Sequence, residues 1–301
     1  MTHRGKIALE EVTVVTPDLE RSATRAESRR GFLLALPGYA YLVIFFAVPM
    51  LIIFVYSFGT RSATGKTILG DWNIDSYRRL FDDLVLGVMW RSLWLALATT
   101  VICLLISYPF AYYIATRGPR LRGLLMVLVM IPFWTNFLVR TYAWRLILGR
   151  NGPLAAVLGF IGVDEPRLLF TNSAILIGLV YGHLPFMVLP LYASIERLDW
   201  SLVEAARDLY ASGWKAFGKV TLPLSMPGVV GGTILTFIPS FGAYIEPELL
   251  GGAQTMMLGS FIENQYYAVS DWPFGSALSF VIMALMLAGT ILYFRKGGSS
   301  A

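Results

Sequence analysis

The sequence has 301 residues, of which 56% are hydrophobic and only 14% are charged, and its formal net charge is +5. Soluble domains usually carry about a quarter charged residues, so this composition argues against an ordinary soluble domain and predicts a protein embedded in lipid. The basic residues stand at the ends of apolar runs, which argues against a nucleic-acid-binding surface. The single cysteine, Cys103, cannot form an internal disulfide, and we interpret it as a packing residue.

The chain begins with a polar segment, residues 1–30, which we interpret as a flexible cytoplasmic tail. The apolar run that follows is too long for the core of a cleavable signal peptide, so we expect it to remain as a membrane span. A helix needs about 20 apolar residues to cross the ~30 Å hydrocarbon core. Six runs without Asp, Glu, Lys or Arg meet this length approximately, and they predict six spans: Gly31–Phe58, Leu93–Ala115, Leu124–Leu138, Ser173–Tyr192, Pro227–Ile245 and Ser276–Tyr293.

The distribution of basic residues predicts the orientation of these spans. Of the 24 Lys and Arg residues, 15 fall in the N-terminal tail, residues 117–122, residues 193–226 and the C-terminal tail. Short cytoplasmic loops are enriched in Lys and Arg, so both termini are predicted to lie inside. Arg140 and Arg145, near the outer end of the third span, are expected to snorkel to the interface. The predicted organisation is a tail over 1–30, a six-span membrane domain over 31–294 that contains the inner loop 193–226, a short interfacial helix at Pro153–Phe160, and a tail over 295–301.

One motif is misleading. The stretch Thr64–Thr67 reads TGKT, like the end of a nucleotide-binding P-loop. That loop needs a glycine at the position of Thr60, because its backbone amides wrap the phosphates, and no strand precedes it. We therefore expect this chain not to bind ATP there.

The inner loop 193–226 carries the most informative pattern. Ser201 and Glu204 have capping-box spacing, which predicts a helix that starts at Ser201. The chain is expected to turn at Ser212–Gly213, and a second short helix is predicted over Trp214–Val220. These patterns alone leave two interpretations open: an amphipathic interfacial hairpin, or a compact knob that docks a partner.

The loop resembles the EAA loop of bacterial ABC importer permeases. Glu204–Ala206 reads EAA, and Leu222 and Pro223 follow at the family's spacing, whereas the family's glycine falls at Tyr210, with Gly213 shifted nearby. Further stretches are similar to the B-type subunit of the spermidine/putrescine-type permeases: Pro132–Trp144, Asn151–Leu154, Leu184–Asp199 and Pro247–Gly252.

The resemblance implies an all-α membrane protein of the type I ABC importer permease fold, with six spans and both termini inside. It implies a non-catalytic subunit in the bacterial inner membrane that forms half of a pathway for a small cationic solute such as a polyamine. The implied partners are a second permease of the C-type, two ATP-binding subunits that hold ATP and Mg²⁺, a soluble solute-binding protein and the lipid bilayer, with no nucleic acid and no cofactor on this chain. The residues implied to couple to the ATPase are Ser201, Glu204, Ala205, Ala206, Asp208, Gly213, Leu222 and Pro223.

Several residues are candidates for the solute pathway. Gly228 and Gly232 in span five form a GxxxG pair, which allows close helix packing. Pro239 follows in the same span and marks either a gate or an ordinary kink. Acids without basic neighbours after span five suggest an acidic outer vestibule, or they reflect positive-inside bias alone. Aromatic residues there could bind an amine or form an interfacial belt. The candidates are Trp134, Asn136, Tyr142, Trp144, Pro239, Tyr244, Glu246 and Glu248.

Other functions remain as alternatives at this stage. An ABC permease for an amino acid, an opine-like compound or a metal ion would share the same motifs. An ion-coupled secondary transporter would normally place ionisable residues within its spans, and the six runs contain no carboxylate. A membrane enzyme would need a nucleophile, base or metal constellation, and the two His and one Cys offer little material for one.

Overall fold

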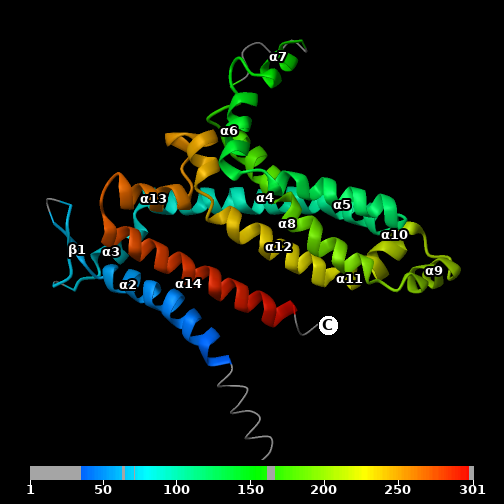
Figure 1. Ribbon diagram of the computed structural model, residues 1–301, viewed down its shortest axis with the longest axis horizontal. Coiled ribbons are helices and arrows are strands. Elements are labelled where there is room, and N and C mark those ends of the chain that lie inside the picture. Colours follow the sequence, from blue (N-terminus) through cyan, green and yellow to red (C-terminus); the bar gives the residue numbers. More distant parts are fainter. Residues whose placement is uncertain (1–34, 63–64, 71, 161–166, 298–301) are drawn as a thin grey trace, which may run out of the picture. The chain divides into compact units, whose positions relative to one another are not determined.

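Long apolar helices dominate the computed structural model, which describes residues 35–297 except 63–64, 71 and 161–166 (Figure 1). Among these residues, four helices are long and apolar enough to cross a membrane: Ala35–Tyr56, Asp83–Ala115, Asn172–Glu196 and Trp272–Leu292. Two bent helix pairs bring the number to as many as six if each pair is one span. The prediction of an all-helical membrane protein is confirmed, and each apolar run corresponds to one of these candidates. The N-terminal tail predicted over 1–30 lies outside the described residues.

The chain forms two units, residues 1–55 and 56–301, and each is described by itself. The described part of the first unit is a helix that contains the π-helical turn η1 (Val43–Ala47) and most of α2 (Val48–Tyr56). The second unit begins with a short antiparallel hairpin, β1 (Thr60–Arg61) and β2 (Thr67–Ile68). It continues with α3 (Asp75–Arg78), η2 (Arg79–Phe81), α4 (Asp83–Ala115), α5 (Pro119–Trp134), α6 (Phe137–Ile147), α7 (Pro153–Phe160), α8 (Asn172–Glu196), α9 (Trp200–Asp208), α10 (Gly213–Ala216), η3 (Phe217–Thr221), α11 (Leu222–Leu224), α12 (Met226–Phe241), η4 (Pro247–Gly251), η5 (Ala253–Thr255), α13 (Leu258–Tyr267) and α14 (Trp272–Gly297).

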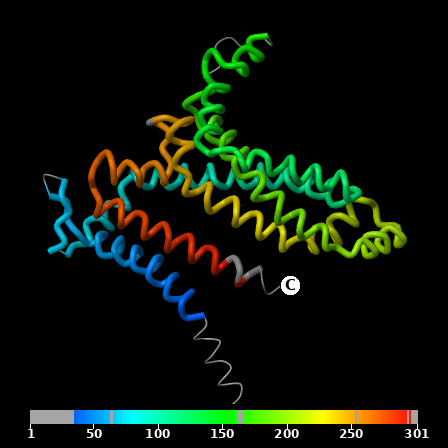
Figure 2. The backbone as a smooth tube through the Cα atoms, viewed as in Figure 1, coloured from blue at the N-terminus to red at the C-terminus, as the bar shows by residue number. Residues whose placement is uncertain are grey.

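The centre of the second unit is a bundle of α4, α8 and α12, which run side by side in both views (Figures 1 and 2). One buried apolar cluster joins α4, α5 and α8 and includes Ile114, Val129 and Leu191. A second cluster joins the start of α4 to the end of α12, α13 and α14, and it includes Phe241 and Leu278. The two clusters fix α4 along its length.

Close packing of α12 on α8 depends on glycine. A Cβ on Gly228 would lie 2.5 Å from the Cβ of Ser194 and 2.7 Å from the carbonyl oxygen of Pro190. A Cβ on Gly232 would lie 2.6 Å from the sulfur of Met187. The GxxxG prediction of close helix approach is confirmed, since larger residues could not be accommodated at this separation.

The third apolar run is not one straight helix. α5 ends at Trp134 and α6 starts at Phe137, with a bend of 89° between them. The continuous span predicted over Leu124–Leu138 is therefore wrong at its outer end. Asn136 caps α6, because its side-chain oxygen accepts from the amides of Leu138 and Val139 at 2.9 and 3.2 Å. An Asx cap of this kind starts a new helix in a new direction.

Two other boundaries bear on the site. The helix predicted over Pro153–Phe160 is confirmed as α7 with the same bounds. Span five is bent by 65° between the segment Gly213–Leu224 and α12, with Ser225 at the bend. α12 then ends at Phe241, shortly after Pro239, rather than at the predicted Ile245.

Candidate coupling loop and solute pathway

The segment Trp200–Leu224, which we call the knob, projects beyond the ends of α8 and α12 (Figure 1). Its first helix, α9, starts at Trp200 and is capped by Asp199, whose carboxylate accepts from the amide of Ser201 at 3.0 Å. The predicted start at Ser201 is therefore wrong, and Ser201 lies in the first turn. Hydrogen bonds from the Ser201 side chain and backbone hold the pKa of Asp199 below its usual value. A carboxylate also interacts more favourably with a helix N-terminus than a hydroxyl does.

Tyr210 ends α9 in a left-handed conformation, with φ of 59°. The amide of Tyr210 donates to the carbonyl of Arg207 at 2.9 Å, and the amide of Ala211 donates to Ala206 at 3.1 Å. This pair of bonds is a Schellman motif, whose left-handed residue is usually glycine. The glycine expected at this position by resemblance thus has a conformational reason, and this chain forms the same turn with tyrosine.

The second half of the knob follows the predicted turn. Ser212 caps α10, because its hydroxyl accepts from the amide of Lys215 at 3.4 Å. The chain then passes through α10, η3 and α11 to Leu224, so the predicted second helix over Trp214–Val220 is confirmed in its essentials. Gly213 is the first residue of α10, and Leu222 and Pro223 form α11.

The knob exposes large apolar side chains. The exposed fractions of Leu209, Tyr210 and Trp214 are 82%, 96% and 85%. Ala205 beside them is exposed and Ala206 is half-buried, so small side chains lie next to large ones. Isolated apolar residues on a surface are common, but a group of this kind on a projecting segment is typical of an interaction site.

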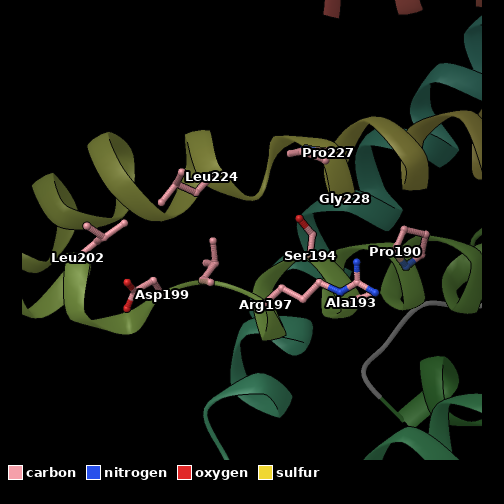
Figure 3. A pocket seen from close by; sticks show the side chains of 10 residues that line it. Pro190, Ala193, Ser194, Arg197, Asp199, Leu202, Leu224, Pro227 and Gly228 are labelled. Carbon is pink, nitrogen blue, oxygen red and sulfur yellow. The ribbon is translucent and has the colours of Figure 1, made fainter. Parts of the chain in front are cut away.

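An ion pair between α5 and α8 lies beside the base of the knob. Arg122 at the start of α5 forms an ion pair with Glu196 at the end of α8, and its guanidinium lies 5.6 Å from the ring centroid of Tyr192. Across this base, a pocket of about 590 Å³ separates the end of α8 from α11 and α12 (Figure 3). Its lining includes Ser194 and Arg197 on one side and Leu224 and Gly228 on the other.

The pathway candidates divide into exposed and packed residues. Trp134 and Asn136 lie at the α5–α6 break and are exposed, whereas the ring of Trp144 packs edge-on against Tyr181 at 5.4 Å. The remaining exposed candidates are Tyr142, Pro239, Tyr244 and Glu248.

Glu246 is the exception, since its residue is only 3% exposed. It lies against α8, where Gly178 and Gly182 leave room for it. The position that a Cβ on Gly182 would occupy is 3.8 Å from a carboxylate oxygen of Glu246 and 3.5 Å from a guanidinium nitrogen of Arg140. Arg140 therefore faces Glu246 across a glycine, and it also donates to the carbonyl of Pro132 at 2.9 Å. In this conformation Glu246 is an internal acid with a nearby cation, and it does not line an open mouth.

A second acid of the same stretch is also paired. The carboxylate of Asp271 forms an ion pair with the guanidinium of Arg79 at 2.7 Å. It also caps α14 by accepting from the amide of Phe274. The guanidinium of Arg79 lies 4.1 Å from the ring centroid of Phe274. The stretch lacks basic residues in sequence, but η2 and α6 bring arginines to it in space.

Sequence reasoning did not identify Asp199 or Arg140 as parts of these sites. It also missed Tyr108 on α4, whose hydroxyl lies 2.7 Å from the hydroxyl of Ser225 at the bend before α12. An Asp two residues before a capping-box serine is a local signal that marks a second candidate for the cap. The contacts of Arg140, Tyr108 and Ser225 join segments far apart in sequence, and no local pattern marks them.

A multi-span helical bundle with a projecting, capped loop knob is the architecture of a transporter's membrane subunit. Residues 107–295 match the family model described as binding-protein-dependent transport system inner membrane component. The chain belongs to this family of ABC importer permeases, and it is accordingly a multi-pass inner-membrane transport component rather than an enzyme.

Individual relatives agree. The chain is 42% identical over 257 residues to the spermidine/putrescine transport system permease protein PotB of Escherichia coli K12, which covers 85% of this chain and 93% of that protein. It is 30% identical over 280 residues to the inner membrane ABC transporter permease protein YdcU of the same organism, with 88% of each covered. A chain in the crystal structure of a bacterial ABC transporter involved in alginate import has the same fold, with a TM-score of 0.70 at 16% identity over 94% of this chain and 99% of that one.

Proposed function

We propose that this chain is the B-type permease of a polyamine importer, and that it forms half of the translocation pathway beside a distinct C-type permease. The observation that carries the proposal is the 42% identity to PotB over nearly the full length of both chains. That relative's name specifies spermidine and putrescine, and the substrate class of this chain follows from the likeness. ATP and Mg²⁺ belong in this proposal to two partner ATPases, and a soluble binding protein delivers the solute.

The knob supports the proposed coupling to an ATPase. It is held rigidly at its start by the Asp199 cap and at the α9 turn by the Schellman motif. It exposes Leu209, Tyr210 and Trp214 where a partner's cleft could enclose them. A rigid projection that leads directly into α8 and α12 can pass a partner's motion to the bundle. In this proposal the knob and both termini lie in the cytoplasm, as the 15 basic residues of those segments favour.

The direct test reconstitutes this chain with its partner permease, ATPase and binding protein in liposomes. Uptake of labelled spermidine and putrescine should depend on ATP and on the binding protein, and this chain alone should transport nothing under an imposed ion gradient. A panel of amino acids, metal ions and other amines serves as the comparison. ATP-dependent uptake of a different solute in preference to polyamines would contradict the substrate class and leave the ABC importer assignment intact.

A further inference from the structure

The bend at Ser225 is held from two sides. The hydroxyl of Ser225 lies 2.7 Å from the hydroxyl of Tyr108 on α4 and 3.1 Å from the carbonyl oxygen of Leu222. The single proton of Ser225 goes to the Leu222 carbonyl, which can only accept, so the Tyr108 hydroxyl donates to Ser225. On the other side, the hydroxyl of Ser194 on α8 donates to the Ser225 carbonyl at 3.4 Å.

The same face of α4 also contacts the rest of the knob. The ring of Tyr108 meets Phe217 of η3 edge-on at 5.4 Å. One helical turn further on, the ring of Tyr112 meets Trp200, the first residue of α9, at 5.7 Å. Residues four apart lie on one face of a helix, so α4 touches the beginning of the knob, its second half and the bend that follows it.

α4 continues from these contacts to the opposite end of the unit. Its 33 residues span about 50 Å as a helix. Near its start, the hydroxyl of Ser92 accepts from the amide of Leu258 at 2.8 Å, and Arg91 donates to the carbonyl of Gln254 at 2.9 Å. One continuous helix therefore joins the knob to the segment that leads into α13.

We propose that α4 is a second route by which motion of the knob reaches the far end of the bundle, and that the Tyr108–Ser225 hydrogen bond is its joint. Tyr108 is a positioning residue in this role: it holds the bend at the angle at which displacement of the knob moves α4 and α12 together. The inference rests on the proposed function, since it requires an ATPase that moves the knob. The pocket on the α8 side of the bend leaves space there, whereas the α4 side is filled by the rings of Tyr108 and Phe217.

The test is Tyr108→Phe, which removes the donating hydroxyl and keeps the ring against Phe217. Reconstituted transporters are compared by the ratio of solute imported to ATP hydrolysed. We expect this ratio to fall about fivefold, the factor that corresponds to the ~1 kcal/mol net contribution of a hydrogen bond. Co-purification of the ATPase and the partner permease should be unchanged, because the exposed face of the knob is untouched. The matched control is Tyr113→Phe, whose exposed ring faces Arg117 instead of the knob.

Ser225→Ala removes the other partner of the bond. If the bond is the joint, Tyr108→Phe combined with Ser225→Ala should lower the ratio no further than Ser225→Ala does alone. A wild-type ratio in Tyr108→Phe, an equal fall in Tyr113→Phe, or additive losses in the double variant would each overturn the inference. Failure of the unmodified assembly to couple ATP hydrolysis to uptake would instead contradict the proposed function.

Discussion

The knob differs from the α6–η4 region, which comprises α6, η4 and Glu246, in whether its chemically important side chains are exposed or buried. The knob leaves Leu209, Tyr210 and Trp214 exposed and satisfies its backbone with local caps. In the α6–η4 region Glu246 is buried against α8, and Arg140 faces it. No sequence pattern links these two residues. A surface for a partner can thus be defined within some 25 residues, whereas an internal charge site needs three segments that only the fold brings together.

The largest expected effect comes from overfilling the small face of the knob. Ala206→Trp should prevent a partner cleft from closing over α9, because overpacking costs ~1–3 kcal/mol. Since 1.4 kcal/mol is a factor of ten in affinity, recovery of the ATPase in pull-down and ATP-driven uptake should both fall about tenfold or more. Ala156→Trp on the exposed side of α7 is the control for the substitution itself. Full retention of ATPase and transport by Ala206→Trp would reduce the knob to a linker.

The second-largest effect is a difference in stability between substitutions of two nearby acids, the buried Glu246 and the exposed Glu248. Glu246→Gln removes the carboxylate charge that faces the Arg140 guanidinium at a buried site, so the attraction between the two groups is lost. Thermal unfolding in detergent should therefore shift downward for Glu246→Gln. Glu248→Gln, on an exposed residue two positions away, should leave the unfolding temperature near that of the unmodified protein. Equal shifts for the two variants would contradict the internal role of Glu246.

Two substitutions of Tyr210 separate the effect of its left-handed backbone strain from the effect of its exposed ring. Tyr210→Gly removes the left-handed strain of a residue with a Cβ, worth ~1 kcal/mol, and should strengthen the α9 turn. Hydrogen exchange at the Ala211 amide should slow about fivefold, since this amide closes the turn on Ala206. Tyr210→Ala removes the same aromatic surface but keeps the strain, so exchange should not slow. Slowing in both variants would assign the effect to the ring instead of the backbone.

Substitution of Glu248 should have a smaller effect, and the quantity affected is the rate of solute uptake. As an exposed acid near the end of α12, it should attract a cationic solute, and exposed charges contribute about 0.2–1 kcal/mol. Glu248→Gln should lower the uptake rate about twofold at low salt and not at all at high salt, because screening acts over ~10 Å at 0.1 M. Glu263→Gln, on α13, is the comparison. Unchanged uptake at low salt would leave the exposed acids with a topological role only.

The smallest effect concerns pH. The pKa of Asp199 is lowered in the folded chain, so its cap stabilises α9 above the ordinary Asp pKa of about 3.9, and this stabilisation is lost as the pH falls through the folded value. The cap should therefore be intact throughout the neutral range. The amide chemical shift of Ser201 reports it, and Asp199→Asn should remove the acid transition while keeping a cap. A transition near neutral pH would contradict the lowered pKa.

Local patterns predicted much of the fold. Apolar run lengths identified the spans, the Gly228–Gly232 spacing indicated close helix packing without naming the partner helix, and Pro153–Phe160 was placed with the bounds of α7. Each of these depends on residues within a few turns of one another. The start of α9 was misplaced by one residue, because Asp199 competes with Ser201 as the cap and the sequence does not rank them.

The solute side was less predictable for a physical reason. Glu246, Arg140 and Gly182 are separated by tens of residues, and burial of Glu246 depends on how η4 packs on α8. An acid without basic neighbours in sequence was therefore interpreted as open to solvent. Asp271 shows the same pattern, since its partner Arg79 lies 192 residues away.

The break between α5 and α6 has a consequence for how the chain inserts into lipid. α5 has 16 residues and is about 24 Å long, shorter than the ~30 Å hydrocarbon core. Its end supplies its own hydrogen-bond partners, because Thr135 and Arg140 both donate to the Pro132 carbonyl while Asn136 accepts from the first amides of α6. Backbone groups satisfied in this way need no water, and irregular backbone is tolerated at membrane depth only when it is satisfied. The chain can therefore change direction at membrane depth without leaving these backbone groups unpaired.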